Sequence, residues 1–156
     1  MKLYIQVDEQ NNFINHPHFG SNLEQMYPNH DFESGPPEGW MEFIRVAPPE
    51  IGVYQKFDDN IGSNIANAFQ HNGLEYKIVD GKYTDVWHVL DMTEEEIAEK
   101  QQVTKESFAE YPNYASWTFN EEKCTFEPPV EYPTDGNLYR WDEETTSWVE
   151  FVPEEP

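Results

Sequence analysis

Lysine and arginine are scarce in this sequence: its 156 residues include 9 of them against 31 aspartates and glutamates, for a formal net charge of −22. Proteins that bind DNA, RNA or an anionic membrane surface depend on cationic side chains that neutralise phosphate groups. A chain with this charge repels such surfaces, so we exclude nucleic acid and membrane as partners. Solubility, a basic protein partner and mimicry of nucleic acid are the three explanations that remain for the excess of acid.

Cysteine and long apolar runs are scarce as well. Cys124 is the single cysteine, which excludes an internal disulfide and a zinc site built on several cysteines. No apolar run approaches the roughly 20 residues that a membrane-spanning helix needs, and the opening segment MKLYIQVDEQ lacks the pattern of a signal peptide. We therefore expect the chain to be made and folded in a cytoplasm.

Motifs that carry catalysis or bind metal are also missing. The sequence has no G-x-S-x-G elbow, phosphate-binding loop or dinucleotide fingerprint. His16 and His18 are separated by Pro17, and no third metal ligand follows them closely. With 31 acids in the chain, no single carboxylate pair is informative about acid–base catalysis. We expect a protein that is not an enzyme and that holds no metal or cofactor.

Aromatic residues are abundant, although hydrophobic residues in total are few. The chain has 5 Trp, 9 Tyr and 10 Phe, which make up 15% of it, while all hydrophobic residues together make up 37%. Each aromatic side chain buries about 150–250 Å², so these residues can replace aliphatic ones in a core. The sequence therefore predicts a folded protein, with tryptophans that pack in the core or, alternatively, stack on sugars.

Hairpin signals dominate the first part of the chain. The alternating residues 3–7 precede a polar turn and Phe13-Ile14, which predicts an opening hairpin that residues 15–19 do not easily continue because of Pro17. Asp80-Gly81 separates two strand-like runs, 76–79 and 83–87, and favours a type I′ turn. Further elements are expected as follows: a short helix capped by Ser21 and ending at Tyr27, strands Trp40–Val46 and Val53–Phe57, and a short helix within 58–73.

A long helix is predicted over residues 93–110. Thr93 and Glu96 form a capping box, and Pro112 follows the expected end of the helix. The helix has few apolar residues, which is typical of an exposed strut between two parts of a protein. We therefore predict an α+β fold of antiparallel hairpins with one long helix and a hairpin-rich C-terminal segment, in two domains, 1–111 and 112–156.

The C-terminal segment contains an internal repeat. Residues 117–126 (WTFNEEKCTF) align without gaps on residues 139–148 (YRWDEETTSW), and a proline-rich connector separates the two copies. Each copy predicts a hairpin with aromatic residues on one face. Because a lone hairpin is marginally stable in water, the two must pack within the chain or on a partner. The candidate partner-binding residues are Trp117, Phe119, Phe126, Tyr139, Trp141 and Trp148.

Three segments together resemble a family. The run YASWTFNEEKCTFEPPVEYPTDGNLYRWDEETTSWVE resembles the C-terminal part of small virion-associated structural proteins of marine and cyanobacterial tailed phages. The run KIVDGKYTDVWHVLDMTEEEIAEKQQ and the earlier FINHPHFGSNLEQMYP with GWMEFIRV are similar to preceding parts of these proteins, whereas the insert at 58–73 departs from them. The aromatic hairpins have a weaker similarity to tail-fibre assembly proteins.

The resemblance implies a bacteriophage virion structural protein, associated with the tail or tail fibre or decorating the capsid, that acts by protein–protein binding. The expected partners are other phage structural proteins or further copies of the chain itself, and the expected location is the virion. Two alternatives remain open from the sequence: a tail-fibre assembly chaperone, and an acidic nucleic-acid mimic that inhibits a host protein.

Overall fold

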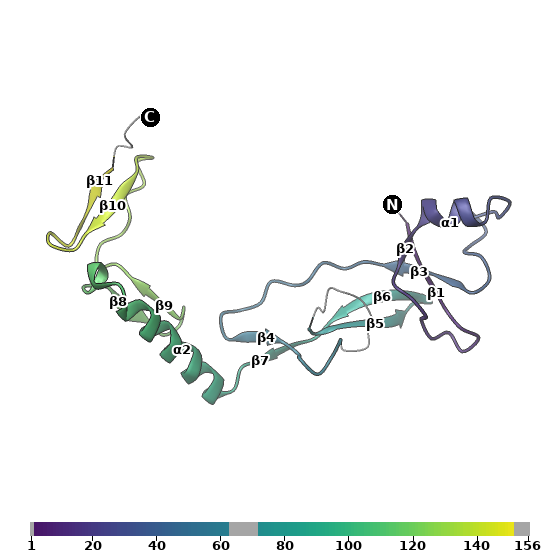
Figure 1. Cartoon of the computed structure of the whole chain (residues 1–156), viewed down its shortest axis with the longest axis horizontal. Coiled ribbons are helices and arrows are strands. Elements are labelled where there is room, and N and C mark those ends of the chain that lie inside the picture. Colours follow the sequence, from purple (N-terminus) through teal and green to yellow (C-terminus); the bar gives the residue numbers. More distant parts are fainter. Residues whose placement is uncertain (1, 63–71, 152–156) are drawn as a thin grey trace. The chain divides into compact units, whose positions relative to one another are not determined.

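The computed structural model describes residues 2–62 and 72–151, and the chain divides into two compact units, Met1–Asp91 and Met92–Pro156. We call these the N-terminal unit and the C-terminal unit (Figure 1). The α+β class is confirmed, with antiparallel hairpins and one long helix. The boundary lies at Asp91–Met92 rather than near residue 111, because the long helix packs with the hairpins that follow it.

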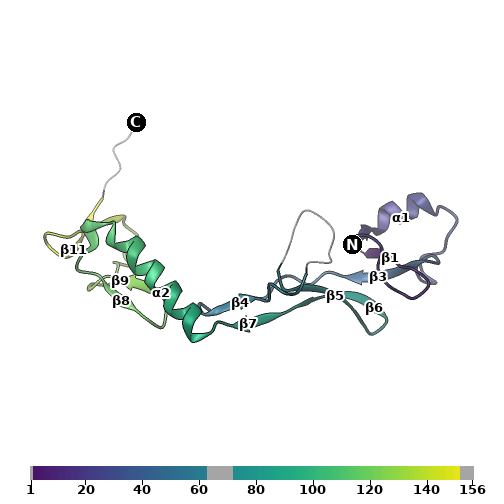
Figure 2. The ribbon, with the colours of Figure 1, turned by 60° about the horizontal axis from the view of Figure 1, so that its bottom comes forward.

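A five-stranded sheet forms the centre of the N-terminal unit, in the strand order β2-β1-β3-β6-β5. Neighbouring strands in this sheet pair antiparallel, except β3 and β6, which pair parallel. The strands are β1 (Leu3–Gln6), β2 (His18–Phe19), β3 (Trp40–Ile44), β5 (Leu74–Val79) and β6 (Lys82–Trp87). Figure 2 shows a two-stranded ribbon that continues beyond β5 and β6; it consists of β4 (Gln55–Phe57) and β7 (Val89–Asp91).

The opening hairpin forms as predicted and then extends further than expected. Val7 bridges Phe13, and the Asp8 carboxylate accepts hydrogen bonds from the backbone N–H groups of Gln10 and Asn12 in the turn between them. Pairing resumes in β2, where Phe19 lies opposite Leu3. The expectation that residues 15–19 do not easily continue the strand is therefore wrong for His18 and Phe19, because the interruption at Pro17 is local.

The helix α1 (Gly20–Met26) follows β2 directly and ends before Pro28, as predicted. Its N-cap is Phe19 rather than Ser21, and no side chain caps it. The Gly20 N–H donates instead to the Lys2 carbonyl at 2.9 Å. A hydrogen bond to the neighbouring strand therefore replaces the side-chain cap that the sequence suggested.

The core of the N-terminal unit lies on both faces of the sheet, since β1 buries consecutive residues. On one face, Ile5 is fully buried and packs in a cluster with Val7, Phe43 and Tyr83. On the other face, Tyr4 packs with Leu23 of α1 and Trp40. Because neighbouring residues of a strand point to opposite faces, this pattern means that both faces are covered. Trp40 and Tyr83 satisfy their polar atoms with Tyr27 and the Asn11 carbonyl respectively.

The hairpin of β5 and β6 confirms the predicted Asp80-Gly81 turn. The φ angles of these two residues are 49° and 75°, as a type I′ turn requires. The strands β3 and β4 are shorter than predicted, since β3 ends at Ile44 and β4 begins at Gln55. A turn precedes β4, and in it the Gln55 N–H donates a hydrogen bond to the Gly52 carbonyl. The helix predicted within 58–73 lies largely outside the described residues.

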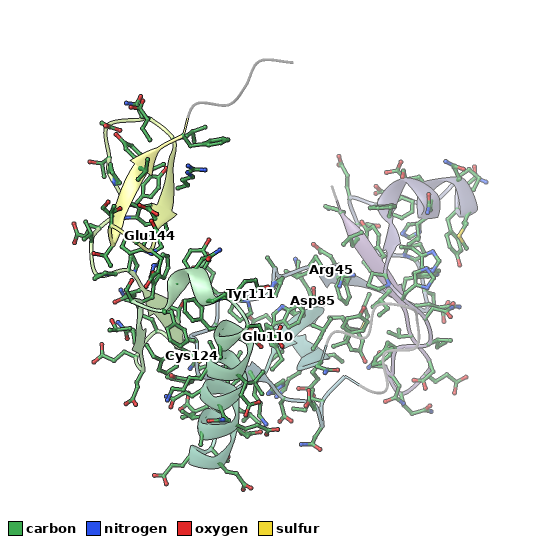
Figure 3. The ribbon with its side chains drawn as sticks, turned by 60° about the vertical axis from the view of Figure 1, so that its left-hand side comes forward. Arg45, Asp85, Glu110, Tyr111, Cys124 and Glu144 are labelled. Atoms are coloured by element: carbon green, nitrogen blue, oxygen red, sulfur yellow. The ribbon has the colours of Figure 1, made fainter. Side chains whose placement is uncertain are left out.

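A buried carboxylate fastens the end of β3 to β6. Asp85 is 3% exposed, and its carboxylate accepts hydrogen bonds from Arg45 at 3.1 Å and from the Val46 N–H at 3.0 Å. Figure 3 shows the two labelled side chains, Arg45 and Asp85, close to one another. The pair holds the chain segment that leaves β3 against the sheet.

The C-terminal unit consists of one long helix, a 3-10 turn and two hairpins. The helix α2 (Glu94–Ala109) begins with the predicted capping box of Thr93 and Glu96 and has no buried residue. The remaining elements are η1 (Pro112–Tyr114), β8 (Thr118–Asn120), β9 (Thr125–Glu127), β10 (Tyr139–Asp142) and β11 (Ser147–Glu150). We call β8–β9 the first hairpin and β10–β11 the second hairpin; each is a separate two-stranded sheet.

Candidate protein-binding site

The two copies of the repeat adopt the same local structure. Phe119 pairs with Phe126 in the first hairpin, and Trp141 pairs with Trp148 at the corresponding place in the second. In both hairpins the paired rings are 5.2 Å apart. The last turn residue has a positive φ in both as well, 49° at Cys124 and 46° at Thr146. The repeat is therefore structural as well as sequential.

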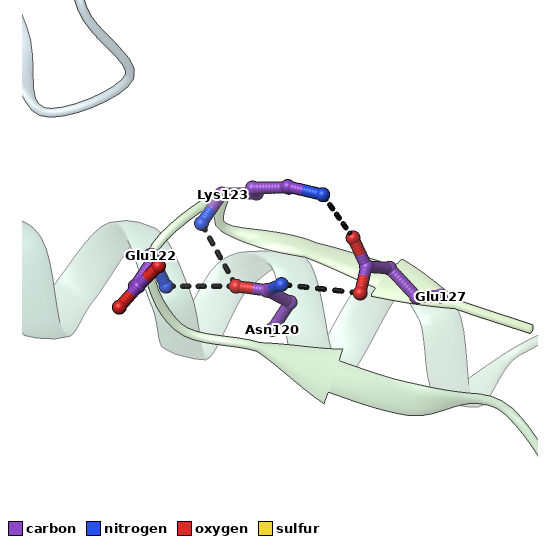
Figure 4. Close-up of polar contacts among 4 residues, drawn as sticks. All are labelled: Asn120, Glu122, Lys123 and Glu127. Carbon is purple, nitrogen blue, oxygen red and sulfur yellow. Dashed lines mark hydrogen bonds and ion pairs between the residues drawn. The ribbon is translucent and has the colours of Figure 1, made fainter.

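Polar side chains fix the turn of the first hairpin (Figure 4). The Asn120 side-chain oxygen accepts hydrogen bonds from the N–H groups of Glu122 and Lys123, and its NH₂ donates to Glu127 at 3.1 Å. Lys123 Nζ lies 2.6 Å from the same Glu127 carboxylate. The hydrogen bond from Lys123 lowers the pKa of Glu127 and raises the pKa of Lys123.

Glu143 joins the second hairpin to the segment before β8. Its carboxylate accepts hydrogen bonds from Trp141 Nε1 at 2.8 Å, from the Ser116 N–H at 2.7 Å and from the Ser116 hydroxyl at 2.9 Å. The bond from Trp141, followed by those from Ser116, holds the pKa of Glu143 below its usual value. This carboxylate therefore remains ionised at neutral pH, and it holds both the indole of Trp141 and the segment at Ser116 that leads into β8.

The helix α2 covers the first hairpin with an aromatic ring and a cation. Phe108 stacks on Phe126, with ring centres 3.8 Å apart and planes inclined by 4°. Lys105 Nζ lies 4.5 Å from the centre of the Phe119 ring, which is the geometry of a cation–π contact. Cys124 is buried beneath the helix, with its sulfur 3.6 Å from the Thr104 hydroxyl (Figure 3).

Aromatic contacts then connect the first hairpin to the second. Trp117 lies within 6.1 Å of Phe108 on one side, and it meets Trp141 and Trp148 edge-on at 5.8 and 6.1 Å on the other. Tyr114 of η1 lies 5.2 Å from Trp117. The indole N–H of Trp117 is buried and has no hydrogen-bond partner in residues 2–62 and 72–151, at a cost of about 1–3 kcal/mol.

The proline-rich connector packs against the second hairpin. The ring of Tyr132 lies 4.9 Å from Trp148, and its hydroxyl oxygen accepts a hydrogen bond from the Tyr139 N–H. Trp148 Nε1 donates to the Val130 carbonyl at 2.9 Å. The Tyr139 hydroxyl donates to Asp135 at 2.6 Å, and this bond lowers the pKa of Asp135 and raises that of Tyr139.

All six candidate residues therefore lie in one connected set of rings, and each of them is partly buried. The sequence left open whether they pack within the chain or on a partner. In the structure, contacts within the chain bury part of the surface of each of these side chains. Sequence reasoning missed three members of the set, Phe108, Tyr114 and Tyr132. The only signal for them was their aromatic character, because their positions depend on how α2, η1 and the connector fold back.

An open pocket of about 770 Å³ remains between η1 and the second hairpin. Aromatic rings and carboxylates line it together, which neither copy of the repeat suggests by itself. The lining residues are Asn113, Tyr114, Trp117, Tyr139, Arg140, Trp141, Asp142, Glu143, Glu144 and Trp148. We call this the aromatic–acidic pocket; Glu144, on the turn of the second hairpin, is labelled in Figure 3.

The opposite face of the second hairpin is apolar and exposed. The Phe151 N–H donates to the Leu138 carbonyl at 2.7 Å, which places these two residues opposite one another at the open end of the hairpin. Their side chains are 46% and 57% exposed, and Val149 on the same face is 38% exposed. Since Trp141 and Trp148 occupy the other face, the second hairpin carries apolar residues on both sides.

Comparison with protein-family models, curated proteins and solved structures finds no match for this chain. In residues 2–62 and 72–151, no group of three or more His, Cys, Asp or Glu side chains is placed to hold a metal ion. The rings of His16 and His18 stack with their centres 4.8 Å apart. Within the same residues, no helix is long and apolar enough to cross a membrane.

Proposed function

We propose that this protein is a structural or accessory component of a bacteriophage virion and that it binds other proteins through its C-terminal unit. The observation that carries the binding role is the second hairpin, which has tryptophans on one face and the exposed residues Leu138, Val149 and Phe151 on the other. Apolar residues gathered on an exposed face are typical of surfaces that another protein covers.

The burial within the C-terminal unit supports the same proposal. Cys124 is the only buried residue among the described residues 92–151, whereas the N-terminal unit has buried residues on both faces of its sheet. A unit with so little buried apolar surface gains stability when a partner covers it. The virion is proposed as the setting because the sequence resembles virion-associated phage proteins, and the net charge of −22 would keep free copies soluble before assembly.

Mass spectrometry of gradient-purified phage particles tests this proposal. We expect the chain at a fixed copy number, in either the tail or the capsid fraction after the two are separated. A chain found in infected-cell lysate and absent from particles would overturn the virion role and would favour the assembly chaperone or the nucleic-acid mimic instead.

A pair of variants tests whether the second hairpin is the attachment surface. Particles assembled with Leu138→Ser and Phe151→Ser together are expected to lose the chain, since both exposed apolar contacts are removed. Val103→Ser is the control, because Val103 is 55% exposed on α2 and lies outside the hairpin. Equal incorporation of both variants would contradict the assignment of this surface.

A further inference from the structure

The first hairpin shows what covers the aromatic pair of a repeat in this fold. Phe108 of α2 stacks on Phe126, and Lys105 of the same helix places its ammonium group 4.5 Å from the centre of the Phe119 ring. One helix thus supplies an apolar ring and a cation to the two aromatic residues. The free energy of such a cation–π contact comes from the negative face of the ring.

The second hairpin has the same pair of positions, but no described residue places a cation on either ring. Trp141 corresponds to Phe119 and Trp148 to Phe126, and both indoles line the aromatic–acidic pocket. Cation–π contacts in the described part of the chain include those on Phe43, Tyr76 and Phe119, and none is found there on these two tryptophans. Tryptophan is the aromatic side chain that attracts a cation most strongly, so the second pair is the better receptor of the two.

The charges around the pocket favour a cation as well. Three carboxylates, those of Asp142, Glu143 and Glu144, line it together with one cation, Arg140. Glu143 is engaged with Ser116 and Trp141. Glu144 is exposed and makes no hydrogen bond or ion pair with the described residues, so its carboxylate is available to a ligand.

We infer that the aromatic–acidic pocket receives a cationic side chain, arginine or lysine, from a partner protein, and that this side chain lies on Trp141 as Lys105 lies on Phe119. Arginine fits best, because its planar guanidinium group stacks on an indole while it pairs with a carboxylate such as Glu144. The inference rests on the proposed protein-binding function and adds the chemistry that the partner must present.

The test follows the indole N–H signals of the isotope-labelled full chain by NMR while N-acetyl-arginine methylamide is added. We expect saturable shifts of the Trp141 and Trp148 signals, which weaken as salt is added because the attraction is between charges. N-acetyl-citrulline methylamide is the matched probe, since it has nearly the same shape and no charge; it is expected to cause no saturable shift. The lysine derivative is expected to bind more weakly at the same signals.

Two glutamates at the same position of the two turns provide a matched pair of variants. Glu144→Gln removes a carboxylate from the pocket and is expected to weaken arginine binding about two- to fivefold. Glu122→Gln makes the same change in the first hairpin, outside the pocket, and is expected to leave the binding unchanged. Both residues are exposed, so both variants are expected to fold.

Three results would overturn the inference. They are equal binding of the citrulline derivative, loss of binding in both variants alike, and saturable shifts with methyl β-glucoside in place of the arginine derivative, which would make the pocket a sugar site. The outcome is separate from the virion role: a chain present in particles that does not bind arginine contradicts the pocket alone, whereas a chain absent from particles that binds arginine contradicts the virion role alone.

Discussion

Gly73 lies where the β5–β6 hairpin meets the ribbon of β4 and β7. Its φ is +80°, and a Cβ atom added there would lie 2.6 Å from the His88 carbonyl oxygen and 2.9 Å from Phe57 Cβ. Its own N–H donates to the Ile61 carbonyl, and its carbonyl accepts from the His88 N–H. The backbone has little room to move away from an added methyl group, because it is hydrogen-bonded on both sides.

Gly73→Ala is therefore expected to destabilise the N-terminal unit by clearly more than about 1 kcal/mol, since alanine adds both strain at positive φ and a steric clash. Urea unfolding followed by circular dichroism measures the change. Gly81→Ala is the control, because Gly81 has a φ of +75° and no atom of the described residues lies within 4 Å of an added Cβ, so that only strain remains. Equal losses in the two variants would mean that the contacts at Gly73 relax.

The environment of His18 predicts that the stability of the N-terminal unit depends on pH. Burial, and then the nearby His16, lower the pKa of His18, whose Nε2 is buried without a hydrogen-bond partner in residues 2–62 and 72–151. The folded state thus disfavours the charged ring. The stabilising contribution is complete above the unfolded pKa of about 6.5 and is lost as the pH falls from there toward the lower folded value.

We expect the urea midpoint of the N-terminal unit to fall between about pH 7 and pH 5, and to fall less in His18→Phe, because phenylalanine does not titrate. The substitution retains a ring that can contact Trp40, which His18 meets edge-on at 5.2 Å. An identical decrease in the variant and the parent would assign the pH dependence to other groups.

Glu143 links the second hairpin to the segment before β8, and its hydrogen bonds predict an effect of substitution on the stability of the C-terminal unit. Three donors converge on its carboxylate, and glutamine at this position has a single acceptor oxygen, so Glu143→Gln loses at least one of these bonds. The lowered pKa means that the contribution of the carboxylate is present above the unfolded pKa of about 4.3 and disappears as the pH falls through the folded value.

Tryptophan fluorescence during thermal unfolding tests this role. We expect Glu143→Gln to lower the melting temperature of the C-terminal unit at neutral pH. Glu144→Gln, one residue further along the turn, is expected to leave it unchanged, because Glu144 has no partner among the described residues. If both variants melt like the parent, Glu143 does not fix the second hairpin.

At the scale of elements, the turns of the two hairpins have a positive φ at the same position, which is Cys124 in the first and Thr146 in the second. Thr146 has a φ of 46°, and a β-branched residue in this region is an outlier. Thr146→Gly is expected to stabilise the second hairpin by about 1 kcal/mol, since glycine has no Cβ to clash there. Thr146→Ala retains the Cβ atom and therefore most of the strain, so the melting temperature should rise in the glycine variant alone.

The elements that the sequence predicted are those specified by neighbouring residues. The turn at Asp80-Gly81, the capping box at Thr93 and the two copies of the repeat each contain their signal within a few positions. The parallel pairing of β3 with β6 and the stacking of Phe108 on Phe126 join distant segments, and no local pattern encodes them. The repeat is a local pattern, so the sequence predicts the six aromatic candidates. The pocket that four of them line with Tyr114 and Glu144 joins η1 to the second hairpin, and no local pattern predicts it.

At the scale of the whole molecule, the two units differ in how they bury apolar surface. The N-terminal unit has fully buried side chains, Ile5 and Leu23, whereas the described C-terminal residues bury only Cys124 and otherwise depend on partly buried rings. Local opening of a protein requires less free energy where few apolar contacts are buried. The free chain should therefore be unequally stable along its length.

Hydrogen exchange of the full chain, measured by mass spectrometry, tests this difference. We expect the amides of β1, β3 and β6 to exchange at least about tenfold more slowly than those of β10 and β11, which corresponds to a difference of about 1.4 kcal/mol in opening free energy. Equal protection in the free chain would mean that the ring contacts alone stabilise the second hairpin, and that the hairpin needs no partner to cover it. If protection of β10 and β11 rises only in assembled particles, the stability that the free unit lacks is supplied by the partner.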